Sequence, residues 1–226
     1  MKNEKRMSVR KSRRSPENES VRQRLLTAAT DLFTRKGYAT TTVREIVGAA
    51  GVTKPVLYYY FRNKEGIYLE LMREAFARLE ELIDDSAGDR GSATQKLLRL
   101  CERTYTLFME NVKVARVMYS IYYGPQQGAP FFDFDSYHLK FLEAVRGLIE
   151  EGIRRGEFRK GNPEDMTWAI LGAINVAMEV HLGHIELVLG RQGLGRVLKL
   201  IFQGKCEGRP GDVRDLLRTP AGSALL

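Results

Sequence analysis

A short stretch near the N-terminus carries side chains of the types that contact the backbone and base edges of a nucleic acid. Three consecutive tyrosines, Tyr58, Tyr59 and Tyr60, closely follow Lys54, and Lys64 comes soon after them. A phenol hydroxyl can donate a hydrogen bond to phosphate, and its ring can pack on a sugar or a thymine methyl group. Because three adjacent tyrosines on one short helix cannot all be buried, the pattern predicts an exposed contact surface beside a polyanion.

Two short helices must position these side chains. Thr42 and Glu45 have the spacing of a capping box, in which each side chain bonds the backbone N–H of the other residue, so a helix begins after Thr42. Gly51 ends this helix, since a residue without a Cβ permits the sharp turn that follows. Thr53 can cap the second helix, and Pro55 is tolerated in its first turn. The sequence predicts two helices joined by a tight turn.

A helical wheel separates the side chains of the second helix. Leu57 and Phe61 define its buried face, Tyr59 lies opposite, Tyr58 lies on one flank and Tyr60 is half-packed. We expect Lys54, Tyr58 and Tyr59 to reach a groove, Thr53 and Tyr60 to hold phosphates, Lys64 to anchor the flank, and Arg44 to reach a guanine or a phosphate. The full set of predicted contact residues is Thr42, Arg44, Thr53, Lys54, Val56, Tyr58, Tyr59, Tyr60 and Lys64.

The charge of the chain is concentrated near these helices. The 226-residue chain has a net charge of +8, and residues 1–64 carry 15 basic and five acidic side chains, whereas residues 65–226 carry 21 basic and 23 acidic ones. All of the excess positive charge therefore lies on the N-terminal part, as attachment to a polyanion requires. We find no uncharged apolar stretch of the roughly 18–20 residues that span a membrane, and no signal peptide, so we expect a cytoplasmic protein.

Residues 28–68 carry a resemblance to a known family. Their sequence, AATDLFTRKGYATTTVREIVGAAGVTKPVLYYYFRNKEGIY, combines a Gly-Tyr break, T-x-x-x-I, A-A-G-V and L-Y-x-Y-F before a Lys that opens a long helix. This order resembles the DNA-binding domain of the tetracycline-repressor (TetR) family of bacterial transcription regulators. The resemblance implies binding to double-stranded DNA. The family often has His at the position of Tyr59, so a neutral phenol here replaces a titratable ring.

The rest of the chain is predicted to be all-α. We expect a disordered basic arm over 1–20, a three-helix DNA-binding domain over 21–66, a larger helical domain over 67–204 and an irregular tail over 205–226, with about nine helices in total. Lys11, Arg13 and Arg14 of the arm could enter a minor groove. Beyond the first three helices, the predicted ones cover about 64–84, 93–110, 112–122, 131–155, 163–189 and 191–203, and the break at 84–92 is a hinge candidate between the two domains.

The larger domain offers two predicted surfaces. In the family the last two long helices pair with their copies in a dimer, and the resemblance implies the same homodimer here. Aromatic and Met side chains are dense in the preceding helices; they are either ordinary core or the lining of an apolar pocket. The family places its inducer pocket among these helices, so we expect a small, largely apolar effector at Tyr105, Phe108, Met109, Met118, Tyr122, Tyr137, Phe141 and Trp168.

Candidates for other chemistry are few. His181 and His184 have a spacing that can chelate a metal ion, but hydrogen-bonded polar groups are the simpler interpretation, so we predict no metal and no cofactor. Cys101 and Cys206 belong to no CxxC pair, and we expect Cys101 to be a buried thiol. Asp133 and Asp135 are two apart and do not face one another on a helix. We find no catalytic motif and expect no enzyme.

These observations support a dimeric repressor that an effector releases from a pseudo-palindromic operator. Two alternatives use the same fold. One is a structural or division-control protein that uses DNA as a scaffold and responds to no small molecule, and a tightly filled core would favour it. The other is a transcriptional activator that contacts polymerase. The sequence does not choose among them.

Overall fold

The computed structural model describes residues 16–125, 127–183 and 189–203, and within these ranges the protein is all-α. The helices are α1 (Pro16–Lys36), α2 (Val43–Ala50), α3 (Lys54–Phe61), α4 (Lys64–Ala87), α5 (Ala93–Glu110), α6 (Val112–Tyr122), α7 (Phe134–Arg154), α8 (Pro163–Gly183) and α9 (Gly190–Gln203). The predicted fold class and the predicted order of helices are confirmed.

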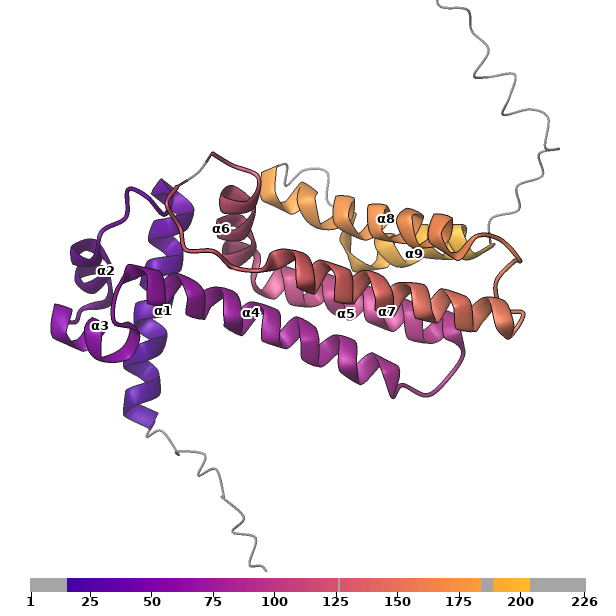
Figure 1. Cartoon of the computed structure of the whole chain (residues 1–226), viewed down its shortest axis with the longest axis horizontal. Coiled ribbons are helices and arrows are strands. Elements are labelled where there is room, and N and C mark those ends of the chain that lie inside the picture. The colour runs from indigo at the N-terminus through magenta and orange to yellow at the C-terminus, as the bar shows by residue number, and fades with distance from the viewer. Residues whose placement is uncertain (1–15, 126, 184–188, 204–226) are drawn as a thin grey trace, which may run out of the picture.

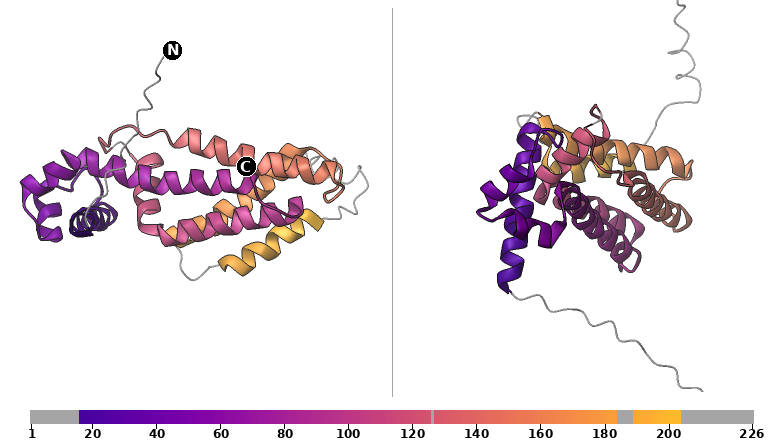
Figure 2. Two further views of the ribbon diagram at one scale, coloured as in Figure 1. Left: turned by 90° about the horizontal axis from the view of Figure 1, so that it is seen from below. Right: turned by 60° about the vertical axis from the view of Figure 1, so that its left-hand side comes forward.

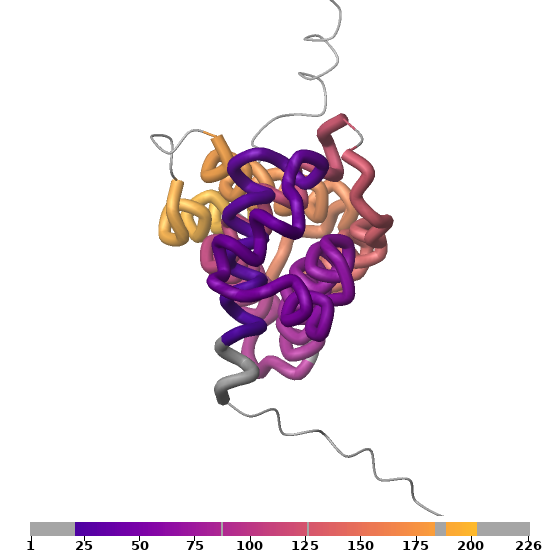
Figure 3. Tube along the Cα trace, turned by 90° about the vertical axis from the view of Figure 1, so that its left-hand side faces the viewer, coloured from indigo at the N-terminus to yellow at the C-terminus, as the bar shows by residue number. Residues whose placement is uncertain are grey.

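The molecule is elongated, with the first three helices at one end (Figure 1). From them α4 runs lengthwise into the larger domain, where α5, α7, α8 and α9 lie roughly along the same direction. The short helix α6 stands across this direction, next to α1, and the two further views agree on that position (Figure 2). Seen from the end of the molecule, α1, α2 and α3 lie in front of the larger domain (Figure 3).

Two hydrophobic cores correspond to these two parts. The first joins α1, α2 and α3 to the beginning of α4 and includes Leu25, Phe33, Ile46, Leu57, Ile67 and Met72. The second is built from the end of α4 together with α5, α7, α8 and α9. One buried residue of the first core, Val117, comes from α6, which lies far along the chain. The core of the N-terminal module is therefore completed by a side chain from outside the first four helices.

Several predicted boundaries need correction. The arm expected over 1–20 overlaps α1, because residues 16–20 belong to that helix. Residues 1–15 and the tail from 204 lie outside the described residues. The boundary expected at residue 66 falls inside the module, because Ile67 to Met72 complete the first core. The predicted hinge at 84–92 lies at the far end of α4, where it connects α4 to α5 (Figure 1), so it does not separate the domains.

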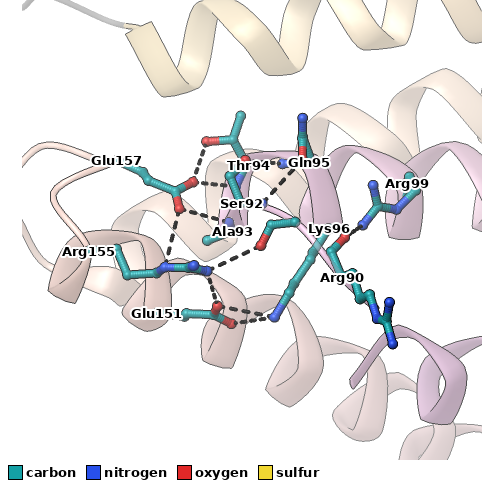
Figure 4. A network of polar contacts seen from close by, with 11 residues as sticks. Arg90, Ser92, Ala93, Thr94, Gln95, Lys96, Arg99, Glu151, Arg155 and Glu157 are labelled. Atoms are coloured by element: carbon teal, nitrogen blue, oxygen red, sulfur yellow. Dashed lines mark hydrogen bonds and ion pairs between the residues drawn. The ribbon is translucent and has the colours of Figure 1, made fainter. Parts of the chain in front are cut away.

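The end of the larger domain that lies away from the module is held by ion pairs and a helix cap (Figure 4). The carboxylate of Glu157 accepts hydrogen bonds from the backbone N–H groups of Ala93 (3.0 Å) and Thr94 (2.9 Å), the first residues of α5. These bonds lower the pKa of Glu157 in spite of its partial burial. Lys96 pairs with Glu151 at 3.1 Å. Because helix N-termini carry partial positive charge, the Glu157 cap holds the segment that follows α7 against the start of α5.

We expected no apolar stretch long enough to span a membrane, but one helix meets that criterion. Helix α8 is long and apolar enough, by length and composition alone, to span a membrane, and a third of its apolar window is buried in the protein. Its inner face packs in the second core through Ile170, Leu171, Ile174 and Ala177. A core helix with this packing passes the same test, so the observation is weak evidence for a membrane span.

Candidate DNA interface and effector cavity

Capping residues fix the two short helices as the sequence predicts. The hydroxyl of Thr42 accepts from the N–H of Glu45 (3.3 Å), and the carboxylate of Glu45 accepts from the N–H of Thr42 (2.9 Å), which completes the capping box. An ion pair with Lys36 and the bonds from Thr42 hold the pKa of Glu45 at about 2. Gly51 ends α2 at φ 64°, in the left-handed region where a side chain would be strained. Thr53 occupies the cap position of α3, but its hydroxyl makes no capping hydrogen bond there.

The tyrosines of α3 are placed as the wheel predicts. Leu57 and Phe61 are buried, whereas Tyr59 is 78% exposed and Tyr58 is 48% exposed. Tyr60 is half-buried and its ring packs edge-on against that of Tyr59, with centroids 5.1 Å apart. Lys54 and Arg44 are exposed, and Val56 is half-buried. The outer side of α3 therefore presents phenol rings next to a cation, at the free end of the molecule (Figure 1).

Lys64 has a structural role that the sequence did not indicate. Its ammonium group donates to the carbonyl oxygens of Tyr38 (2.9 Å) and Ala39 (3.4 Å) and lies 4.2 Å from the centre of the Tyr38 ring. Burial lowers its pKa. These contacts offset the unfavourable position of a cation in the first turn of α4, where Asn63 provides the side-chain cap through a 2.7 Å bond from Gly66. The expected phosphate anchor is thus already engaged in joining α4 to the loop after α1.

The module is joined to the larger domain by α4 and by α6. Arg22 of α1 forms ion pairs with Glu70 and Glu74 of α4. On α6, Lys113 pairs with Asp31 of α1 at 2.7 Å, and its carbonyl accepts a hydrogen bond from Thr34 (3.3 Å).

The loop after α6 adds a further contact between the two parts. The side chain of Gln127 accepts from the N–H of Tyr38 (3.0 Å) and donates to the carbonyl of Ser120 (3.1 Å). Helix α6 and its loop thus contact the module directly, and this connection was missed because it joins segments about 80 residues apart that share no local pattern.

A cavity of about 280 Å³ lies in the larger domain next to α6. Helices α4, α5, α6, α7 and α8 all contribute to its wall, which is mostly aromatic and aliphatic. The polar residues of the wall are Thr104, Asn111, Tyr119, Tyr122, Tyr123, Asp135, Tyr137, His138, Asn175 and Glu179. A mostly apolar hollow with a few polar groups is the usual form of a small-molecule site.

The cavity contains some of the predicted effector residues but not all of them. Phe108, Met118, Tyr122, Tyr137 and Phe141 line it, together with Phe76, Phe134 and Tyr119, which were not among the predicted set. Three of the predicted residues do not line this cavity. Tyr105 is buried in the second core, where its hydroxyl is 2.7 Å from Nε2 of His181. Met109 packs against the same core. Trp168 is 58% exposed on the outer face of α8 and does not line the cavity.

The remaining candidates have ordinary structural roles. Asp133 caps α7 by accepting from the N–H of Ser136 (3.2 Å), whereas Asp135 accepts a hydrogen bond from the hydroxyl of Tyr122. Cys101 is a buried free thiol, and burial raises its pKa to about 12. His184 and Cys206 lie outside the described residues. Within the part of the chain that the structure describes, no group of three or more potential metal ligands occurs.

Comparisons with known proteins agree with this architecture. The model of the bacterial regulatory proteins of the tetR family matches residues 25–71. The fatty acid metabolism regulator protein of Bacillus subtilis is 26% identical over 138 residues, which cover 61% of this chain and 70% of that protein. The HTH-type transcriptional repressor KstR2 of Rhodococcus jostii is 25% identical over 158 residues, covering 66% and 74%. The TetR family regulator PfmR from Thermus thermophilus superposes with a TM-score of 0.66 at 23% identity, over 80% of this chain and 98% of that one.

The matched stretch contains both short helices, their caps and the exposed tyrosines, and the larger domain shares its fold with full-length regulators. Residues 25–71 are therefore a DNA-binding domain of the TetR family. The matched domain and the named relatives make the protein a DNA-binding transcriptional regulator.

Proposed function

We propose that the protein is a homodimeric repressor that binds a pseudo-palindromic operator and is released from it by a small molecule held in the cavity. The observation that carries this proposal is that α6 lines the cavity and also contributes Val117 to the core of the DNA-binding module. A ligand that moves α6 therefore acts directly on α1. Relatives that are named repressors, including KstR2, support repression over activation.

The DNA contacts of the proposal are those of the exposed side of α3. Tyr58 and Tyr59 would enter the major groove with Lys54, and Thr42, Thr53, Val56 and Tyr60 would contact the DNA backbone or a neighbouring base. Arg44 of α2 is exposed and would reach a guanine or a phosphate. A two-fold dimer would place two such helices in successive major grooves, about 34–36 Å apart.

The proposed dimer interface is the outer face of α8 and α9. Trp168, Gly172 and Val176 follow one another at intervals of four residues along α8, and Val176 is 60% exposed. On α9, Leu200 is exposed as well. Large exposed apolar side chains next to small ones allow a close approach of a second copy, and such patches are uncommon on monomers.

A pair of matched variants tests the dimer. Val176→Glu places a charge in the centre of the proposed interface, and Leu139→Glu places one on α7 at a residue that is 55% exposed and lies outside it. We expect Val176→Glu to sediment as a monomer with weakened operator binding and Leu139→Glu to remain a dimer. Identical behaviour of the two variants would refute the proposed interface.

The release step and the DNA step can be measured separately. If roughly eight phosphates are neutralised per dimer, the logarithm of the binding constant should fall with the logarithm of salt concentration with a slope near −7. A coupling free energy of 1–3 kcal/mol would make an effector weaken operator binding about 5- to 150-fold. Salt-independent binding to DNA selected from a random pool would contradict the proposal.

The two alternative functions make different predictions. The cavity favours regulation by a small molecule over a scaffold protein, for which a filled core would be expected. An activator would differ only in raising transcription where a repressor lowers it. A promoter fusion in a deletion strain should therefore show increased expression if the protein is a repressor and decreased expression if it is an activator. A cytoplasmic location is part of the proposal, since the operator is there.

A further inference from the structure

The charge of the cavity wall is negative. Asp135 and Glu179 contribute two carboxylates, and His138 contributes an imidazole. Neither Lys nor Arg is among the described residues of the wall. Three basic side chains that are adjacent in the chain to residues of the wall have partners outside the cavity. Lys113 pairs with Asp31, the Arg116 guanidinium donates to the carbonyl of His181 (3.0 Å), and Lys140 pairs with Glu80 (3.3 Å) and Asp84 (3.1 Å). None of these three side chains forms an ion pair with Asp135 or Glu179.

Each carboxylate is held by a tyrosine. The hydroxyl of Tyr119 donates to Glu179 (3.5 Å), and the hydroxyl of Tyr122 donates to Asp135. A phenol orients a carboxylate without cancelling its charge. The pKa of both tyrosines is raised. The hydrogen bond to Asp135 is the main cause for Tyr122, and burial followed by the charge of Glu179 is the cause for Tyr119. Both carboxylates belong to exposed residues that also line the cavity, so a bound molecule can reach them from solvent.

The interior of the cavity suits a large apolar group. Phe76 packs against Phe134 and Tyr137, with ring centroids 5.5 Å and 4.7 Å apart, and Phe108 and Phe141 extend this wall. The faces of aromatic rings attract cations. Thr104, also in the wall, has a buried hydroxyl with no hydrogen-bond partner among the residues that the structure describes. Since an unsatisfied buried hydroxyl is costly, this atom points to a polar group supplied by a bound molecule.

We infer that the effector is a lipophilic organic cation, with its positive group between Glu179 and Asp135 and its apolar body against the Phe76 and Phe108 wall. The inference rests on the proposed function, in which the cavity holds the effector, and it adds the chemical class. A fatty acid or another carboxylate would bring a third negative charge to this cavity and would find no Lys or Arg among the described residues of its wall. The name of the Bacillus subtilis relative therefore does not carry over to the ligand of this cavity.

Three probes with the same chain test the inference: decyltrimethylammonium, decanol and decanoate, each below its micelle concentration. Binding to the full-length protein is measured by calorimetry at pH 8, where imidazole is ordinarily uncharged. We expect the cation to bind at least tenfold more tightly than decanoate. Glu179→Gln and Asp135→Asn remove one charge each and keep an oxygen that accepts from the tyrosine, so each should reduce this preference about fivefold.

Controls and outcomes make the test decisive. Glu143→Gln removes an exposed carboxylate of α7 outside the cavity and should leave the preference unchanged. Equal or tighter binding of decanoate by the folded wild-type protein, a preference that survives the double variant, or no binding of any probe would overturn the inference. Operator binding measured with the same probes separates the two proposals. Release of the operator by decanoate would support the proposed repressor function and contradict a cationic effector. Tight binding of the cation without release of the operator would support the cationic ligand and contradict the proposed repressor function.

Discussion

Gly66 makes the position of the recognition helix α3 sensitive to a single methyl group. Gly66 lies in the first turn of α4, and a Cβ built on it would be 1.9 Å from the carbonyl oxygen of Phe61, the last residue of α3. Side-chain carbons essentially never approach other heavy atoms closer than 3.0 Å, so the two backbones must separate by about 1 Å. Gly66→Ala therefore displaces the end of the helix that carries Tyr58 and Tyr59.

Two effects of opposite sign decide the magnitude. Alanine gains about 1 kcal/mol over glycine in helix propensity. Overpacking costs about 1–3 kcal/mol, and because the obstructing atom is backbone and cannot rotate away, the upper value applies. The net loss in the free energy of unfolding is about 2 kcal/mol, which for a chain of this size lowers Tm by about 4–8 °C.

A matched substitution in the same module provides the control. A Cβ on Gly48 of α2 would meet no heavy atom within 4 Å, so Gly48→Ala should gain about 0.5–1 kcal/mol. The assay combines thermal unfolding with fluorescence anisotropy on operator DNA at a temperature where both variants are folded. We expect Gly66→Ala to lose stability and operator affinity and Gly48→Ala to gain stability. If Gly66→Ala matched the wild type in both measurements, the close approach of α3 and α4 would not be a constraint on DNA binding.

Two further predictions concern single side chains. Tyr59→Ala should change the base preference found by selection from random DNA and leave Tm within about 1 °C, because the ring is exposed; an unchanged preference would remove Tyr59 from direct readout. In a Cys206→Ser background, Cys101 should resist alkylation in the folded protein at pH 8, since burial raises its pKa to about 12. The thiol ionises at lower pH in the unfolded chain, so its contribution to stability is complete below about pH 8.5 and is lost as the pH rises towards 12; rapid alkylation of the native protein would contradict this.

Local features of the module could be predicted from the sequence because they depend on near neighbours. The capping box of Thr42 and Glu45, the cap at Asn63 and the outward position of Tyr59 each involve residues within a few positions of one another. Lys64 shows where this reasoning ends. Its partners, the carbonyl groups of Tyr38 and Ala39, are brought near by the fold, and no spacing in the sequence marks them.

The larger domain was harder to predict for two physical reasons. Helix α8 has small and apolar residues on all sides, so periodicity cannot tell its outer face from its inner one. Trp168, which we expected in a pocket, is exposed. The two carboxylates of the cavity lie on α7 and α8, 44 positions apart, and only the packing of these helices brings both into the wall of one cavity. Val117 likewise resembles any core valine until α6 is seen against α1.

The contribution of Val117 to the first core also bears on how such regulators can be recombined. A chimera that joins residues 1–72 of this chain to another effector domain would leave a hole in the core of its own DNA-binding part unless the new α6 supplied a side chain of similar shape and partners for Asp31 and Thr34. The unit that can be exchanged is discontinuous along the chain. It comprises the N-terminal helices together with one face of a helix that begins about 50 residues after the tyrosines it supports.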